Sequence, residues 1–412
     1  MDTSRRNFPA AYWSGISTAA GGERAAVNAR KVDRGAPGAG CPVHRTHDGT
    51  WQVDGYAAAR AFLRDHGTVQ AGLGVETTEN FPRRIRRPVL YRDGPEHREH
   101  RRQTARFFTP RRVDEAYRAV MERVADEQVA LVREGRVVDL ADLSFQVAVD
   151  VTSAVIGLTE SKPGIRRRLD YFFPEEFGEP GFTSLRGLYW VWRQLRGWSA
   201  IYFGDVRPAV RARRAHPRDD LISHLLAEGC TSAEILGECL TFAAAGMVTT
   251  REFIVVAAWH LFTDDGLRSR YLAAEEPERL LVLHEVLRLE PVIGHLKRRT
   301  TRDVRVHDVT VPAGSLVRVQ LDHANLDTAV VGELPAAVCP GRRLADGGSS
   351  TGLSFGDGPH KCPGSHVAML ESDVFLHKLL SLEGIRMVRP PRVAFKDEIA
   401  GYELRGLHVT TG

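Results

Sequence analysis

One cysteine of this 412-residue chain lies in a segment whose residue types suit metal chemistry. The segment runs from Phe355 to Gly364 and reads FGDGPHKCPG, with Cys362 directly before an expected helix. Free backbone N–H groups and the positive end of the helix dipole favour a thiolate there. The same donors can tune a metal-bound sulfur. Gly358 and Gly364 permit turns and the close approach of a flat cofactor, while Phe355 can limit water near the sulfur.

A lone cysteine in a loop is more often buried and structural, and the other four cysteines form no CxxC pair. Cys362 differs because an aromatic residue, two glycines and a histidine stand at fixed offsets from it. The segment resembles the cysteine-ligand signature of the cytochrome P450 family, F-x-x-G-x-H-x-C-x-G, at every specified position. The resemblance implies haem b as the cofactor, with its iron held by the Cys362 thiolate, which favours O–O cleavage.

A second motif supports the first. Glu285-Val286-Leu287-Arg288 matches the family's E-x-x-R, and the i,i+3 spacing puts both charged side chains on one helix face. We interpret the two as a buried structural pair, joined by Arg342 or Arg343, with no catalytic role.

The haem carboxylates need cationic or donor partners. Residues 93–102 resemble the family helix that bears H-x-x-x-R, in which His97 and Arg101 would face the haem. Arg298 matches the family's other carboxylate-binding arginine, and His360 completes the set. The resemblance thus implies the following cofactor-binding residues: Cys362, His97, Arg101, Arg298, His360, Phe355, Gly358, Gly364 and Ala245.

Further arginines follow on this side of the chain, and we interpret them as a solvated basic face. They are Arg98, Arg102, Arg106, Arg111 and Arg112. In the family this side faces the electron donor, so exposed arginines there would steer an acidic ferredoxin.

The expected long central helix carries the oxygen-activating motif. Residues 243–252 read AAAGMVTTRE and resemble the family's A/G-G-x-D/E-T-T/S. Small residues at Ala245 and Gly246 let the helix pass close over the haem and leave space for dioxygen. A threonine hydroxyl there can bond to a carbonyl of its own helix and open a groove. The resemblance assigns catalysis to Thr249 and Thr250, with Thr249 helping to relay protons.

This motif departs from the family because Val248 stands where an acid normally precedes the threonine. Glu252 lies four residues beyond Val248 and three beyond Thr249, so it could reach the same face. One hypothesis is that Glu252, ordered water or a polar group of the substrate supplies protons. The equally weighted alternative is that Glu252 is a surface residue paired with Arg251 or another neighbour.

The resemblance also points to segments that line the substrate pocket, namely Leu73–Phe81, Tyr171–Phe182 and Ile399–Tyr402. The individual candidates are Phe242, Val248, Val292, Ile293, His295 and Tyr402. They are mostly apolar with a few polar groups, as small-molecule sites usually are. Core packing is the competing interpretation for each one, and together they do not name the substrate.

Periodicity predicts a mostly helical chain. We expect a strand and helix between Thr50 and Arg64, helical segments from Pro95 to Leu226, and helices over 232–262, 277–289 and 364–380. The long one begins at a Thr231 or Ser232 cap. Alternation from Val304 to Leu321 around Pro312-Ala313-Gly314 predicts a hairpin, and the last thirty residues resemble short strands.

These elements predict a mainly α fold with a minor β region, and the resemblance implies a cytochrome P450-like fold with the haem between the long central helix and the cysteine loop. No linker divides the chain, so we expect a single domain over residues 1–412, with small sheet parts near 50–64, 298–325 and 385–412.

Composition limits the partners. Lys and Arg number 56 and Asp and Glu 52, and a net charge of +4 does not favour nucleic acid. The first residues lack an apolar run, and stretches such as Phe253–Phe262 are too short to span a bilayer, so we expect a cytoplasmic protein without a membrane partner.

The expected function is oxidation of a small organic molecule, such as a specialised metabolite, by hydroxylation or by oxidative ring closure or coupling. The resemblance implies dioxygen as oxidant and electrons from a ferredoxin and its reductase. Two alternatives remain open: a non-enzymatic haem-thiolate sensor, and a peroxide-using variant suggested by Val248.

Overall fold

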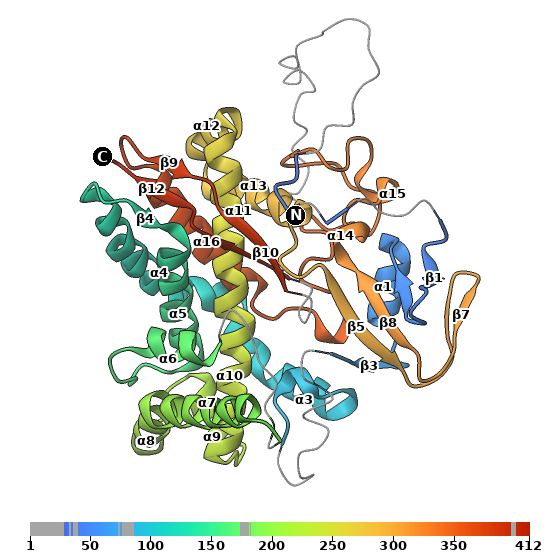
Figure 1. Ribbon diagram of the computed structural model, residues 1–412, viewed down its shortest axis with the longest axis horizontal. Coiled ribbons are helices and arrows are strands. Elements are labelled where there is room, and N and C mark those ends of the chain that lie inside the picture. Colours follow the sequence, from blue (N-terminus) through green and yellow to red (C-terminus); the bar gives the residue numbers. More distant parts are fainter. Residues whose placement is uncertain are drawn as a thin grey trace, which may run out of the picture.

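A computed structural model describes residues 29–32, 34–35, 40–72, 75, 86–173, 181, 183–396 and 401–412. One long helix runs through the middle of the protein (Figure 1). It consists of α10 (Ser232–Ala243), a π-helical turn η5 (Ala244–Val248) and α11 (Thr249–Thr263). Thr231 and Glu234 form a reciprocal capping box at its start, as the sequence predicted for Thr231. The π-helical turn was not predicted.

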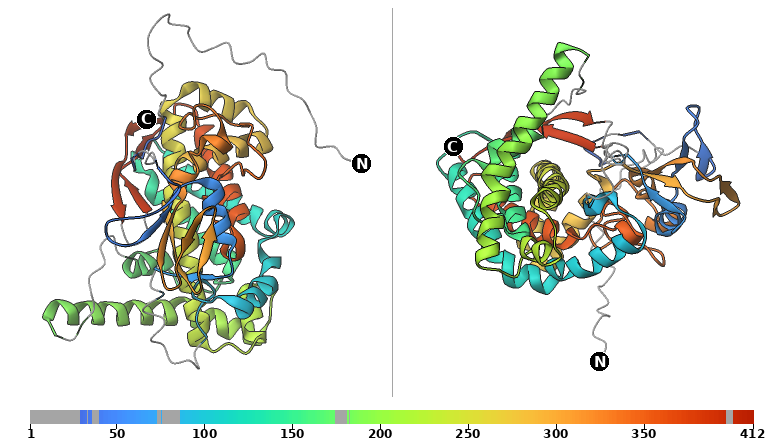
Figure 2. Two further views of the ribbon diagram at one scale, coloured as in Figure 1. Left: turned by 90° about the vertical axis from the view of Figure 1, so that its right-hand side faces the viewer. Right: turned by 90° about the horizontal axis from the view of Figure 1, so that it is seen from below.

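Other helices surround the long helix, which Figure 2 (right) shows end-on in the centre. Their bounds are α3 (Gly94–Thr104), α4 (Pro110–Arg133), α5 (Leu140–Ile156), α6 (Ile165–Phe172), α7 (Leu185–Ile201), α8 (Arg207–Ala215), α9 (Leu221–Ala227), α12 (Asp265–Ala273), α13 (Glu276–Leu289) and α16 (Ser365–Leu380). Shorter helical pieces are η2 (Val89–Tyr91), η3 (Ala105–Phe108), η4 (Tyr202–Val206), α14 (Leu321–Ala324), α15 (Thr328–Val331) and η6 (Gly358–His360). The predicted helices near 277–289 and 364–380 are confirmed as α13 and α16.

The apolar residues of the long helix serve the core. Its second half packs with α4, α5, α13 and α16 into one buried cluster, and its first half packs with α5, α6, α8 and α9 into another. By length and composition Ser232–Thr263 could cross a membrane, but 61% of its apolar window is buried inside the protein. The expectation that the apolar stretches are too short to span a bilayer is therefore wrong for this helix. Its hydrophobic side chains pack inside the protein.

A five-stranded sheet lies beside the helices, in the order β1-β2-β8-β5-β3 (Figure 1). Its strands are β1 (Val43–Arg45), β2 (Trp51–Val53), β3 (Thr68–Gln70), β5 (His295–Thr300) and β8 (Leu316–Gln320). The buried face of this sheet packs against α1 (Tyr56–Arg64). The predicted strand and helix between Thr50 and Arg64 are β2 and α1.

Smaller sheets complete the β structure. They are the hairpin β6 (Val304–Val306) with β7 (Val309–Val311), the hairpin β10 (Arg392–Lys396) with β11 (Gly401–Arg405), and β4 (Val138–Asp139) with β12 (His408–Thr410) and β9 (Arg386–Arg389). The prediction of short strands near the end of the chain is confirmed.

The predicted hairpin around Pro312-Ala313-Gly314 is wrong in its pairing. Val306 pairs with Val309 across a two-residue turn in which His307 adopts a positive φ of 51°. The segment after Gly314 forms β8, which pairs with β5 and β2 instead. The alternation of apolar and polar residues identified the strands correctly. Their pairing depends on the left-handed backbone conformation of His307, which the sequence alone does not predict.

The E-x-x-R pair is buried and holds the loops that lead to the cysteine. Arg288 donates two 2.8 Å hydrogen bonds to Glu285, and it also donates to the carbonyl of Asn325 at 2.7 Å. Arg342 donates to Glu285 at 3.1 Å and to four carbonyls between Val331 and Ala337. The expected structural triad is confirmed with Arg342 as its third member.

Replacing Arg288 by leucine should lower the free energy of unfolding by roughly 3–5 kcal/mol, because Glu285 would stay buried without its main partner. Urea unfolding of the purified protein, followed by circular dichroism, measures this. The exposed Arg343→Leu variant is the matched control and should change stability by less than about 0.5 kcal/mol. Equal losses in both variants would contradict the structural role.

Candidate functional site

The cysteine loop passes the end of α1 and leads directly into α16. The N–H of Cys362 donates to the carbonyl of Phe355 at 2.8 Å, which closes the loop. Gly358 has a positive φ of 67°, and a Cβ there would lie 2.4 Å from the carbonyl oxygen of Leu63. This glycine is therefore required for the loop to pass the end of α1.

Cys362 is a half-buried residue whose thiol lies near the charges of Arg101 and Lys361. Burial raises the pKa of the thiol, while the N–H of Gly364 and the charges of Arg101 and Lys361 act to lower it. The helix start alone thus does not hold a thiolate, contrary to the first argument from sequence. A coordinating metal would remove the thiol proton outright.

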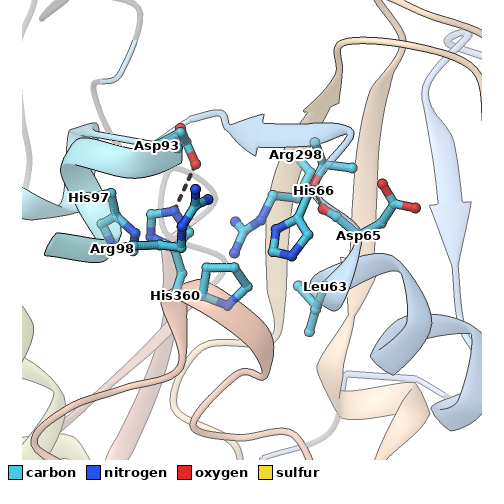
Figure 3. A pocket seen from close by; sticks show the side chains of 11 residues that line it. Leu63, Asp65, His66, Asp93, His97, Arg98, Arg298 and His360 are labelled. Carbon is cyan, nitrogen blue, oxygen red and sulfur yellow. Dashed lines mark hydrogen bonds and ion pairs between the residues drawn. The ribbon is translucent and has the colours of Figure 1, made fainter. Parts of the chain in front are cut away.

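Next to the loop lies a pocket lined by histidines, arginines and acids (Figure 3). His97 from α3 and His360 from η6 stack with their ring centroids 4.0 Å apart. Arg298 reaches the same pocket from β5. The fourth expected residue, Arg101, donates to the carbonyl of Lys361 at 2.6 Å, and so lies against the cysteine loop. The structure thus brings together all four expected carboxylate-binding side chains.

The two acids that line the pocket already have partners, because Asp65 pairs with Arg302 and Asp93 with His360. Arg298 is buried, and burial lowers its pKa to about 10 although Asp93 partly offsets the effect. Burial, His360 and Arg101 together lower the pKa of His97 to about 3, so that this ring is a neutral hydrogen-bonding group at physiological pH. An anionic ligand would relieve the desolvation cost of the buried guanidinium.

Sequence reasoning missed Asp93. Its carboxylate lies 2.8 Å from Nε2 of His360 (Figure 3). Its second oxygen accepts the N–H of Gln70 at 3.1 Å. Asp93 occupies the N-cap position of α3 but makes no side-chain cap bond there. An aspartate at an N-cap position usually caps its own helix. Here its carboxylate bonds to His360 instead, and the sequence alone gives no sign of that partner.

The long helix is distorted where the oxygen-activating motif was expected. Thr249 Oγ1 donates to the carbonyl of Ala245 at 2.5 Å, one turn back across the π-helical turn η5. A Cβ at Gly246 would lie 3.0 Å from Thr152 Oγ1 on α5, so the glycine allows this close helix contact. Ala245 is exposed, whereas the residues on either side of it in the helix are half-buried or buried. The helix therefore presents a small side chain beside the threonine that opens the groove.

Thr250 and Glu252 point elsewhere, and their expected catalytic roles need correction. Thr250 is buried and hydrogen-bonds the carboxyl of Glu371 on α16, whose pKa burial raises well above its usual range. Glu252 is buried too, accepting the N–H of Leu404 at 2.7 Å and pairing with Arg405 at 2.8 Å. One hypothesis held that Glu252 is a surface residue paired with Arg251. The pair with Arg251 is present, but Glu252 lies inside the protein and not at its surface. The other hypothesis, that Glu252 supplies protons, does not account for its bonds to Leu404 and Arg405.

The substrate candidates fall into two groups. Phe242 is partly buried and stacks on Phe108 at 5.8 Å, and Val248 is partly buried one residue before Thr249. Val292 and Ile293 lie in the loop after α13, and His295 is the first residue of β5. Ile293 and His295 are partly buried, and Val292 is buried. The prediction that Tyr402 contacts the substrate does not fit its position, because the side chain is fully buried and its hydroxyl donates to the carbonyl of Glu290.

The expected pocket segments are described only in part. Residues 73–74, 76–81, 174–180, 182 and 399–400 lie outside the described residues.

The chain was compared with known proteins. A family model described as Cytochrome P450 matches residues 281–382. Erythromycin C-12 hydroxylase of Saccharopolyspora erythraea is 28% identical, over 83% of this chain and 84% of that protein. Mycinamicin IV hydroxylase/epoxidase of Micromonospora griseorubida is 29% identical, over 82% of this chain and 84% of that protein. The crystal structure of CYP109E1 from Bacillus megaterium in complex with corticosterone superposes with a TM-score of 0.74 at 21% identity, covering 90% and 95% of the two chains.

The chain belongs to the cytochrome P450 family. It is an oxidoreductase of the monooxygenase type, and the family implies a haem-thiolate iron cofactor. Three observations fit that cofactor to this P450. Cys362 is a half-buried residue, a Cβ at Gly364 would meet nothing within 4 Å, and Arg298 is a buried cation that lines the pocket next to the cysteine loop.

Arg298→Gln should weaken haem retention by about 2 kcal/mol or more, because one haem carboxylate would lose a buried charged partner. Dialysis against apomyoglobin, followed by the ratio of haem absorbance to protein, measures this. Arg299→Gln is the matched control, since Arg299 is the exposed neighbour on the same strand. A retained haem in Arg298→Gln would contradict the assignment.

Glu252→Gln should lower the free energy of unfolding by about 1.5–3 kcal/mol, because it weakens charged hydrogen bonds between α11 and β11. The control Glu127→Gln removes only an exposed pair with Arg123 and should cost less than about 1 kcal/mol. Urea unfolding compares the two. A stable Glu252→Gln protein that couples electrons poorly to product would restore the proton-donor hypothesis.

Proposed function

We propose that this chain is a haem b monooxygenase in which Cys362 ligates the iron, and that it hydroxylates or oxidatively couples a specialised metabolite. Electrons come from a ferredoxin and its reductase. The protein acts in the cytoplasm as a single domain. The observation that carries the proposal is the Thr249–Ala245 hydrogen bond at the π-helical turn, in a chain that also has the complete cysteine signature.

Each part of the site has a task in this proposal. His97, Arg101, Arg298 and His360 bind the haem carboxylates and fix the orientation of the ring. When bound, the haem supplies the iron that activates dioxygen. Thr249 holds a hydroxyl at the groove that η5 opens, where it can relay a proton through ordered water. Phe242, Val248 and Ile293 exclude bulk water and orient the substrate.

The same hydrogen bond favours an enzyme over a haem-thiolate sensor. A sensor needs Cys362 and the carboxylate partners, but it has no use for a distorted helix with a hydroxyl at the distortion. The relatives whose names state an activity are hydroxylases or epoxidases, which also supports an enzyme.

A peroxide-using reaction is the second candidate, and one specific observation favours it. Val248 replaces the acid beside Thr249, and Glu252 is engaged by Arg405 and the N–H of Leu404. Peroxide carries its own protons and electrons and makes less demand on a proton relay. Turnover of one substrate with peroxide and with the ferredoxin system, at equal enzyme concentration, separates the two reactions.

Thr249→Ala tests the proposed function directly. With NADPH, ferredoxin and reductase, the variant should lose at least about tenfold in product per electron consumed, because proton delivery fails. Released hydrogen peroxide should rise by a matching amount. Product is measured by mass spectrometry and peroxide by a peroxidase assay.

Thr241→Ala is the matched control, because Thr241 makes the same i−4 bond, to the carbonyl of Gly237 at 2.9 Å, earlier in the long helix. It should keep normal coupling. Unchanged coupling in Thr249→Ala would exclude the threonine relay, and product formation with peroxide alone would favour the second candidate.

A further inference from the structure

The strand that carries Arg298 has a second basic face. Side chains alternate along a strand, so His295 and Lys297 lie on the face of β5 opposite to Arg298. Lys297 pairs directly with Arg318 of β8 in the antiparallel ladder. Like charges directly opposite each other destabilise a sheet. This pair therefore calls for a compensating negative charge.

A third cation reaches this neighbourhood from the segment before β1. Arg34 donates to the carbonyl of Val292 at 3.0 Å, and its guanidinium lies 5.2 Å from the centroid of the Tyr402 ring. Burial lowers its pKa. It thus connects the basic face of the sheet with the loop that precedes β5.

Two nitrogens of this group are unsatisfied. Nη1 of Arg34 and Nε of Arg318 are buried and have no hydrogen-bond partner among the described residues. Leaving a buried charged donor unpaired costs more than an ordinary lost hydrogen bond. The two guanidinium groups are thus placed to donate to something that is not part of the described chain.

The charges around His295 point to the nature of that ligand. Burial lowers its pKa to about 4, and the groups that lower it further are Arg318, Lys297 and Arg34. Three cations therefore act on one imidazole.

Nearby acids compensate incompletely. Asp48, which acts on Arg318, is fully exposed to solvent. Glu290, which acts on Arg34 together with Asp322, already accepts bonds from His260 and two backbone N–H groups. Asp322 accepts the N–H of His323 at 3.0 Å. None of these three carboxylates bonds to the unsatisfied nitrogens of Arg34 and Arg318.

We propose that Arg34, Lys297 and Arg318, grouped around His295, form an anion-binding site for a carboxylate or phosphate group of the substrate. Guanidinium groups suit both anions because their donors match two oxygens at once. The link to substrate rests on the proposed function, because the site adjoins Val292 and Ile293, which we expect to line the substrate pocket. The substrate class is then an organic acid or phosphate ester.

The test uses the haem-loaded protein and two probes, inorganic phosphate and citrate, at ionic strength held constant with sodium chloride. Isothermal titration calorimetry should find saturable binding of at least one probe to the wild-type protein. The double variant Arg34→Gln/Arg318→Gln should bind it at least tenfold more weakly. The preferred probe distinguishes a phosphate site from a carboxylate site.

Arg305→Gln is the control for net charge, because Arg305 is exposed on the β6–β7 hairpin. It should bind the probes like the wild-type protein. Absence of binding to the wild-type protein, or equal binding by the double variant, overturns the anion site. The carbon monoxide spectrum of the same samples reports on the haem-thiolate enzyme separately, so a failed anion site and a failed proposed function give different results.

Discussion

The buried ion pair between Glu285 and Arg288 is the contact on which the site depends. Arg288 bonds to the backbone at Asn325, while Glu285 accepts the N–H of Cys339 and the guanidinium of Arg342. Asn325 in turn accepts the N–H of Leu353, two residues before Phe355. One helix thus anchors the long irregular segment between β8 and the cysteine loop. Such a segment has few backbone partners of its own, and buried charges that bond to its carbonyls give it one conformation.

The long helix α10–η5–α11 has two tasks, because its side chains form part of the hydrophobic core and also one wall of the candidate active site. Most of α11 is buried, and Thr250 and Glu252 are tied to α16 and β11. Only a short stretch around Ala245 and Thr249 departs from regular helix. The π-helical turn provides this local change without breaking the packing on either side. This division explains why two adjacent threonines, alike in sequence, have different surroundings.

Much of the arrangement follows from sequence because the signals are local. Thr231 caps the long helix, and the offsets of Gly358, His360 and Cys362 specify the loop. Other features depend on partners distant in the chain. The Glu252 carboxylate points toward its partner Arg405, and the Asp93 carboxylate bonds to His360 and does not cap α3. The β6–β7 register depends on the positive φ of His307. An i,i+3 spacing tells which residues share a helix face, but not what that face meets.

The central claim is that Cys362 binds the haem iron as a thiolate, and the absorption spectrum of the reduced carbon monoxide adduct tests it most directly. The wild-type protein should show the red-shifted Soret band of a thiolate-ligated haem, and Cys362→His should lose that band while keeping haem through Arg298 and His360. The variant Cys339→Ser, a matched change at another cysteine, should retain the band. A wild-type spectrum typical of nitrogen ligation, or an unchanged band in Cys362→His, would contradict the account.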